Sequence, residues 1–331
     1  MNVLYILGNG FDKAQGMKTS YPEFYEFLKK KEGSPLLEKM KKAITADKKL
    51  WSDMEWALGL YTSEVKTADD MDNLHDELSR YLQEYLTVED TQFKPIDVMK
   101  NKFLSDFISP EAYLSEVDRV AYNRTIDPVI KTKGSNKRIW VMSLNYTGTL
   151  EKLLNINPHV THKVLNNSVE LRDICHVHGR LGDTIIVGVD NKEQIRNTEL
   201  QSSEDVTNFL VKSEANLAMK NLRHSRCERF IKNANLIVLM GVSWGDTDKR
   251  WWDLIGSELK ERTDLVIINT IYCPNDVPKT RKYKLASVER KERDRLYNKL
   301  GVLTNEEKKN ISNRFFFAIN SAMLNSIWEF Q

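Results

Sequence analysis

The sequence has few cysteines, no long hydrophobic run and almost no net charge. Its three cysteines, Cys175, Cys227 and Cys273, lie far apart and form no C-x-x-C pair, so a disulfide framework is not expected. No apolar stretch reaches the roughly 18 residues that a membrane-spanning helix needs, and the N-terminus lacks the pattern of a secretion signal. We therefore expect a cytoplasmic protein that does not enter a membrane.

The charge is balanced overall but unevenly distributed. A net charge of +2 does not indicate attraction of the whole molecule to nucleic acid. Residues 64–90 carry nine acidic and two basic side chains, whereas residues 279–299 carry nine basic and three acidic ones. Both segments fit a solvated helix face, and the basic one leaves a contact with a polyanion open.

The chain of 331 residues, 41% of them hydrophobic, is long enough to bury a large core. Residues 2–7 are predicted to form a short buried strand. Similar strand patterns, with helical patterns between them, return at residues 137–147, 173–179, 184–190, 235–241 and 263–270. Continuously apolar strands separated by helices are typical of a parallel sheet covered on both faces. The predicted fold is α/β, with a doubly wound, mostly parallel, Rossmann-like sheet.

A helical block separates the first predicted strand from the next. Apolar residues recur at spacings of three and four from Tyr21 to about Asp127, and this spacing predicts helices. Near the end of the chain, residues 314–319 fit either a last strand or a buried helix. The predicted parts are a discontinuous sheet domain of residues 1–19 and 128–275, a helical insertion of residues 20–127 beside the ligand end of the sheet, and a basic, mainly helical segment of residues 276–331.

Four polar motifs follow predicted strands. They are Gly8-Asn9-Gly10-Phe11-Asp12, Asn145-Tyr146-Thr147, His176-Val177-His178-Gly179 and Gly241-Val242-Ser243-Trp244-Gly245-Asp246. Ligands of open α/β sheets bind at the carboxyl ends of the strands. We therefore expect the four motifs to line one binding cleft.

The first motif has two glycines one residue apart. Gly8 and Gly10 would let the backbone take positive φ and approach a pyrophosphate closely. A dehydrogenase fingerprint is excluded because Lys13 stands where the third glycine would be, and a P-loop is excluded because Met17 stands where lysine is needed. The alternative is an ordinary turn from strand to helix, with Asp12 as the N-cap of the helix.

The second and third motifs supply candidate catalytic groups. The amide of Asn145 can position a ribose hydroxyl or a water molecule, although Asn145 or Thr147 could instead cap the following helix. His176 and His178 are predicted to point to the same side of a strand. His178, beside Gly179, is the candidate general base. The other histidines and the cysteines show no ligand spacing, so no metal site is predicted.

The fourth motif repeats the pattern of the first, with a polar loop after an apolar strand. Ser243 can donate a hydrogen bond to a phosphate or a ribose. Asp246 and Asp248 can cap the next helix or bind ribose hydroxyls.

Taken in order, the segments LGNGFD, SLNYTGTLE, HVHG, IIVGV and GVSWGDTD resemble the AbiH family, bacterial proteins associated with abortive infection against bacteriophage. The segment TSYPEFYEFL fits that family too, and the resemblance spans roughly residues 1–270. More remotely, the same order is similar to the sirtuin-like NAD-binding fold.

This remote resemblance implies a role for each motif. It implies that Gly8, Gly10 and Phe11 lie at the dinucleotide loop, that Asn145 lies near the nicotinamide ribose, that His178 is the base, and that Gly241 and Ser243 lie beneath the adenosine side. The other candidate cofactor-binding residues of these motifs are Asn9, Asp12, Tyr146, Thr147 and Asp246. Two residues depart from the pattern, because sirtuin-like proteins usually have serine in place of Asp12 and aspartate in place of Thr147. The paired cysteines of the deacetylase zinc ribbon are also missing, which argues against protein deacylation.

Three functions follow, in this order. The first is an NAD glycohydrolase of phage defence that forms nicotinamide and ADP-ribose, needs no metal, and is activated by a phage-derived trigger, a partner protein or homo-oligomer formation. The second is a non-catalytic sensor or adaptor that binds NAD or ADP-ribose. Nucleic-acid processing is last: residues 279–299 motivate it, but no acidic metal-binding cluster supports a nuclease.

Overall fold

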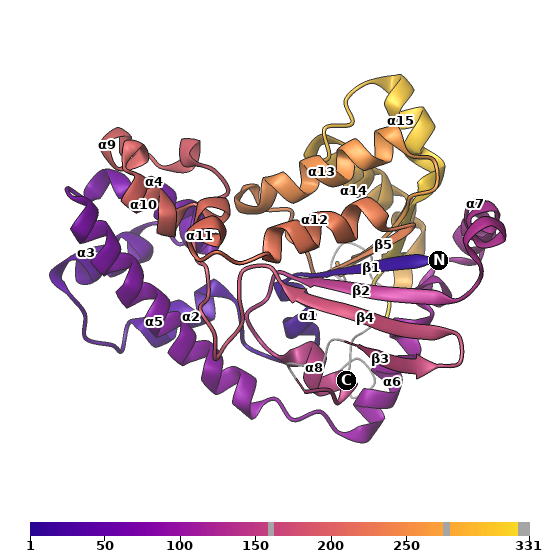
Figure 1. The fold of residues 1–331 in the computed structure, drawn as a ribbon, viewed down its shortest axis with the longest axis horizontal. Helices are drawn as coiled ribbons and strands as arrows, with labels where there is room; N and C mark the ends of the chain where they lie inside the picture. Colours follow the sequence, from indigo (N-terminus) through magenta and orange to yellow (C-terminus); the bar gives the residue numbers. More distant parts are fainter. Residues whose placement is uncertain (158–161, 274–278, 324–331) are drawn as a thin grey trace.

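A seven-stranded sheet lies at the centre of the computed structural model, which describes residues 1–157, 162–273 and 279–323 (Figure 1). Its strands are β1 (Asn2–Leu7), β2 (Lys137–Ser143), β3 (Lys163–Asn166), β4 (Val169–His176), β5 (Leu236–Met240), β6 (Val266–Ile271) and β7 (Phe315–Ile319). Their order across the sheet is β3-β4-β2-β1-β5-β6-β7. All neighbouring pairs are parallel except β3 and β4. The predicted α/β class with a mostly parallel sheet is confirmed.

Strand β1 occupies the middle of the sheet, between β2 and β5. Its side chains alternate between two hydrophobic cores, because successive residues of a strand face opposite sides. Val3, Tyr5 and Leu7 belong to one core. Leu4 and Ile6 belong to the other. The continuous apolar run of β1 is therefore explained by burial on both faces.

Helices cover both faces of the sheet (Figure 1). One layer contains α1 (Asn9–Ala14), α6 (Asp97–Ile108), α7 (Glu116–Lys133) and α8 (Thr149–Leu154). The other contains α12 (Arg223–Asn233), α13 (Lys249–Glu261), α14 (Leu285–Lys299) and α15 (Asn305–Ile311). Of the two alternatives for residues 314–319, the strand is found: Phe315–Ile319 form β7, which pairs with β6 at this edge of the sheet.

The remaining helices form a separate body with its own core, on the left in Figure 1, which we call the helical unit. It comprises α2 (Tyr21–Leu28), α3 (Pro35–Ala46), α4 (Met54–Tyr61), α5 (Ala68–Gln92), α9 (Thr198–Ser202), α10 (Glu204–Leu210) and α11 (Lys212–Ala218). Phe24 and Trp51 pack there in one cluster with Val189 and Leu210 from the second half of the chain. Two segments of the chain thus build the helical unit, while α6 and α7 pack against the sheet instead.

The prediction of a strand at residues 184–190 is wrong. This segment forms only an isolated bridge between Val189 and Val211. Ile185, Val187 and Val189 face the core of the helical unit. A Cβ at Gly188 would lie 2.0 Å from the carbonyl oxygen of Leu210, so the segment is held against α10 rather than in the sheet.

A helix that spans a membrane has to be both long and apolar. Across the described ranges, none of the helices combines the length and apolar character needed to span a bilayer.

Candidate functional site

A cleft of about 510 Å³ opens at the carboxyl ends of the central strands, between the sheet and the helical unit. All four polar motifs contribute to its lining, among them Gly8, Asn145, His178 and Gly241. Tyr21, Ser52, Asp53, Glu55, Leu82 and Leu86 line it from the side of the helical unit. The predicted meeting of the motifs at one cleft is therefore found in the structure.

Gly8, Gly10 and Gly241 pack against one another through their backbones. The N–H of Gly10 donates to the carbonyl of Gly241 at 2.9 Å. A Cβ on Gly8 would lie 2.6 Å from that carbonyl oxygen, and one on Gly10 would lie 2.5 Å from the Gly241 Cα. Only Gly241 of the three has positive φ, at 64°. The expected positive φ at Gly8 and Gly10 is wrong, and these positions need glycine because two loops touch there.

Asp12 lies inside α1, which begins at Asn9, so its interpretation as the N-cap is wrong. Its Oδ2 accepts a hydrogen bond from the hydroxyl of Thr147 at 2.5 Å, and both side chains are buried at the edge of the cleft. Burial raises the pKa of Asp12 to about 6, although hydrogen bonds from Thr147 and Thr149 act in the opposite direction. Thr147 serves Asp12 rather than capping α8, whose N-cap is Gly148.

Asn145 connects the first and second motifs. Its side-chain amide donates to the carbonyl of Gly8 at 3.0 Å, so it does not cap α8. Its own carbonyl oxygen lies 2.8 Å from Nδ1 of His176. The neighbouring Tyr146 donates its hydroxyl to the carbonyl of Ile186 at 3.1 Å. These contacts fix the second motif against both flanking loops of the cleft.

The two histidines of the third motif have different partners. Strand β4 ends at His176, whose Nε2 lies 2.9 Å from the carboxylate of Glu151. Burial alone would lower the pKa of His176, but Glu151 raises it above the usual value. His178 lines the cleft, and its Nε2 lies 2.8 Å from Oδ1 of Asp248. Only His178 is therefore placed to meet a ligand.

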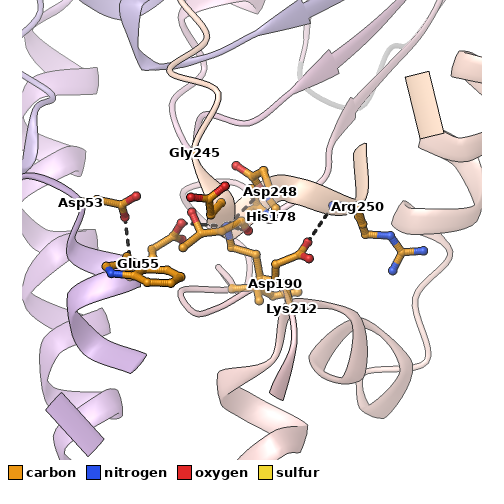
Figure 2. A network of polar contacts seen from close by, with 12 residues as sticks. Asp53, Glu55, His178, Asp190, Lys212, Gly245, Asp248 and Arg250 are labelled. Carbon is orange, nitrogen blue, oxygen red and sulfur yellow. Dashed lines mark hydrogen bonds and ion pairs between the residues drawn. The ribbon is translucent and has the colours of Figure 1, made fainter. Parts of the chain in front are cut away.

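A buried ionic network surrounds this histidine, and Figure 2 shows it. Nζ of Lys212 lies 2.7 Å from Oε2 of Glu55 and 3.0 Å from Oδ1 of Asp248. Burial would lower the pKa of Lys212, but the two carboxylates raise it well above its usual range. Burial would likewise raise the pKa of Asp248, yet Lys212 and His178 hold it well below. The pKa of Glu55 is raised, mainly by burial.

Sequence reasoning missed this network for different reasons. The sequence predicts Asp248 to be a helix cap or a ribose ligand, but its side chain makes no capping hydrogen bond to α13. Glu55 and Lys212 carry no recognisable motif, and the fold brings them together over a separation of 157 residues. A lysine after the apolar run FLV is the only signal in the sequence, and it does not indicate a partner.

Some predicted ligand-binding residues lie away from the cleft. The ring of Phe11 packs in the core at a centroid distance of 5.9 Å from Phe103. Asp246 is exposed and pairs with Lys299 at 2.6 Å. By contrast, Asn9 and Ser243 do line the cleft. In the parts of the chain that the structure describes, no group of three or more His, Cys, Asp or Glu side chains could hold a metal ion.

Comparison with known families adds to this geometry. A family model described as bacteriophage abortive infection AbiH matches residues 4–269. The chain belongs to the AbiH family. In this AbiH chain the matched region includes the four motifs and both Glu55 and Lys212. The family indicates a phage abortive infection protein. No curated protein matches the chain.

Proposed function

We propose that this AbiH protein binds NAD in the cleft and hydrolyses its nicotinamide–ribose bond during phage defence. The observation that carries the proposal is the pair of His178 and Asp248 beside Asn145, in a cleft of about 510 Å³. A histidine oriented by a carboxylate is a common general base. A cleft of this volume is in the range of ligand and cofactor sites.

The topology of the sheet supports a dinucleotide ligand. Its six parallel strands, numbered along the chain, lie in the order 3-2-1-4-5-6, which is that of doubly wound dinucleotide-binding folds. We infer a Rossmann-like, sirtuin-like fold on this basis. The cleft lies beside β1, where the strand order reverses, and ligands of such sheets bind at that point.

The dyad defines which ring nitrogen acts as the base. If Nε2–H of His178 donates to Asp248, the lone pair resides on Nδ1. This atom is buried and has no hydrogen-bond partner among the described residues. An orphan nitrogen of this kind is expected where a ligand supplies the missing donor. We assign that donor to the attacking water or to a ribose hydroxyl.

The proposed reaction is a hydrolysis with a cation-like ribose. The carbon–nitrogen bond between ribose and nicotinamide breaks, and its electron pair leaves with nicotinamide. Water then attacks the anomeric carbon, and its proton passes to Nδ1 of His178, directly or through a ribose hydroxyl. The side chain of Asn145, held by the carbonyl of Gly8, orients the ribose or the water.

The two departures from the sirtuin-like pattern are in contact with each other. The hydroxyl of Thr147 donates to the carboxylate of Asp12. Thr147 lacks the carboxylate that sirtuin-like proteins usually have at this position. Asp12, 135 residues earlier in the chain, places a carboxylate at the same edge of the cleft. We propose that Asp12 supplies the negative charge that stabilises the cation-like ribose.

A sensor without catalysis is the second candidate, and one observation favours it. Nδ1 of His178 is shielded from solvent in this structure, so the base must become accessible before it can accept a proton. A protein that binds NAD or ADP-ribose and never exposes this atom would signal through the helical unit instead.

Nicotinamide release from NAD tests the proposal, measured by chromatography in purified protein with and without phage co-expression. We expect His178→Ala and Asn145→Ala to abolish release and phage protection. The control is His162→Ala, because His162 is exposed and pairs with Glu170 away from the cleft. Intact NAD under every trigger, together with full protection by His178→Ala, would refute cleavage. NAD binding in calorimetry without turnover, with protection lost in Gly10→Val but kept in His178→Ala, would select the sensor.

A further inference from the structure

We propose that Lys212 is a positioning residue that opposes protonation of the His178 ring by sharing the Asp248 carboxylate with it. The catalytic part of this inference rests on the proposed function, in which His178 is the base. The structural part concerns only the charges around the ring and is tested without NAD.

The geometry assigns all the hydrogen-bonding capacity of Lys212 to protein atoms. Its ammonium group contacts Glu55, the carbonyl of Thr247 at 2.9 Å, and Oδ1 of Asp248. An ammonium group has three donors, so none is left for a ligand. Lys212 is only 3% exposed. Any effect of Lys212 on the chemistry therefore passes through its partners.

One carboxylate oxygen of Asp248 contacts both the ammonium group of Lys212 and the ring of His178. Oδ1 of Asp248 lies 3.0 Å from Nζ of Lys212 and 2.8 Å from Nε2 of His178. Asp248 alone would favour a protonated, doubly donating ring, because an opposite charge in contact stabilises the charged form. The ammonium of Lys212 offsets this attraction, and the ring keeps a lone pair on Nδ1.

Other charged groups around the ring come from several elements. Glu55 on α4 pairs with Lys212 and weakens the effect of its charge. His224 on α12 contacts Arg250 on α13 and interacts electrostatically with His178, Lys212 and Asp248. Asp53, Asp190, Tyr146 and Tyr21 also interact with Glu55, Lys212 or Asp248. Removing Lys212 and removing Glu55 should therefore move the protonation of His178 in opposite directions.

The network also joins two bodies of the molecule. Lys212 and Glu55 belong to the helical unit, whereas His178 follows β4 and Asp248 precedes α13. The pair with Glu55 is buried and the pair with Asp248 is partly buried, and together they bridge the two bodies where His178 lies. The helical unit thereby contributes directly to the protonation state of His178.

Histidine NMR titrations of the full-length protein test the proposal, with the His178 signal assigned by its loss in His178→Gln. We expect Lys212→Gln to raise the pH at which half of the His178 rings are protonated by about one unit or more. Glu55→Gln should lower that pH, and the double variant should return it toward the wild-type value. The matched control is Lys249→Gln, because Lys249 pairs with Asp253 at an exposed site, and it should leave the titration unchanged.

Two outcomes would overturn the proposal: an unchanged or lowered titration in Lys212→Gln, or a shift of the same sign in Glu55→Gln. If Lys212→Gln does not fold, because it leaves two carboxylates buried without their cation, Glu55→Gln decides alone, and the absence of a downward shift overturns the proposal. In cleavage assays the acidic limb of the rate profile should follow each NMR shift, with kcat affected and KM for NAD unchanged. NMR shifts as expected without any NAD cleavage would support the role of Lys212 and refute the proposed function.

Discussion

The buried carboxyl group of Asp12 makes the stability of the protein depend on pH in an unusual direction. Asp12 is 1% exposed, and burial raises its pKa to about 6 from an ordinary value of 3.8. The folded state therefore holds the proton more tightly than the unfolded state. Between about pH 4 and pH 6 the folded protein carries the extra proton, so the free energy of unfolding falls as the pH rises through this window.

The replacement Asp12→Asn removes this dependence while keeping an oxygen that can accept the hydrogen bond from Thr147. The difference between 3.8 and about 6 corresponds to about 3 kcal/mol. At pH 4 the unfolded chain is already partly ionised at this position, so about 2.5 kcal/mol of the difference falls between pH 4 and pH 7.5. The stability of the variant minus that of the wild type should rise by this amount from pH 4 to pH 7.5. The change with pH carries the argument, because the new amide brings buried donors whose effect does not depend on pH.

Urea denaturation of both proteins at a series of pH values measures this difference. Asp264→Asn is a control of opposite sign: desolvation would raise the pKa of Asp264, but Arg262 lowers it. That variant should lose stability relative to the wild type as the pH rises toward about 4, because the lowered pKa lies below the ordinary value of 3.8, and its difference from the wild type should be nearly constant from pH 4 to 7.5. If the stability difference between Asp12→Asn and the wild type stays constant from pH 4 to 7.5, Asp12 is not a buried carboxyl group with a raised pKa, and the reasoning fails.

Two further predictions concern backbone geometry. Gly241→Ala should lower the free energy of unfolding, measured in urea, by about 3 kcal/mol or more, because the new Cβ would lie 2.3 Å from the nitrogen of Phe11. The control Gly301→Ala has the same φ of 64° with no atom within 4 Å of the new Cβ, so it should lower that free energy by only about 1 kcal/mol. Equal losses would contradict the packing argument. Thr304→Ala should cost about 1 kcal/mol, because Thr304 and Glu307 form a capping box at α15, while Thr304→Ser should restore nearly all of it. A neutral Thr304→Ala would show that this cap does not stabilise the fold.

The fold was predictable where hydrophobic pattern and position in the chain agree. The run at residues 2–7 has the pattern of a short buried strand, and the four motifs could be placed at one edge of a parallel sheet. Residues 184–190 have the same apolar pattern as a strand. They fill the core of the helical unit, because pattern alone does not reveal which core a segment joins.

The site was predictable in its outline but not in its charges. Gly8, Asn145 and His178 follow strands, so their meeting required only the topology. The partner of His178 required the third dimension, since Asp248 also stands at the start of a helix, where an aspartate is ordinary. Lys212 and Glu55 were beyond sequence reasoning, because a buried ion pair between distant helices has no local pattern.

The contact of Gly8 and Gly10 with Gly241 has a mechanical consequence. Backbone atoms packed this closely cannot slide past one another, so the loops after β1 and β5 form one stiff side of the cleft. The opposite side of the cleft is built by Tyr21 and Asp53 of a body with its own core. Any widening of the cleft therefore has to come from a displacement of this opposite side, and such a displacement would have to break the contacts that Lys212 makes with Asp248.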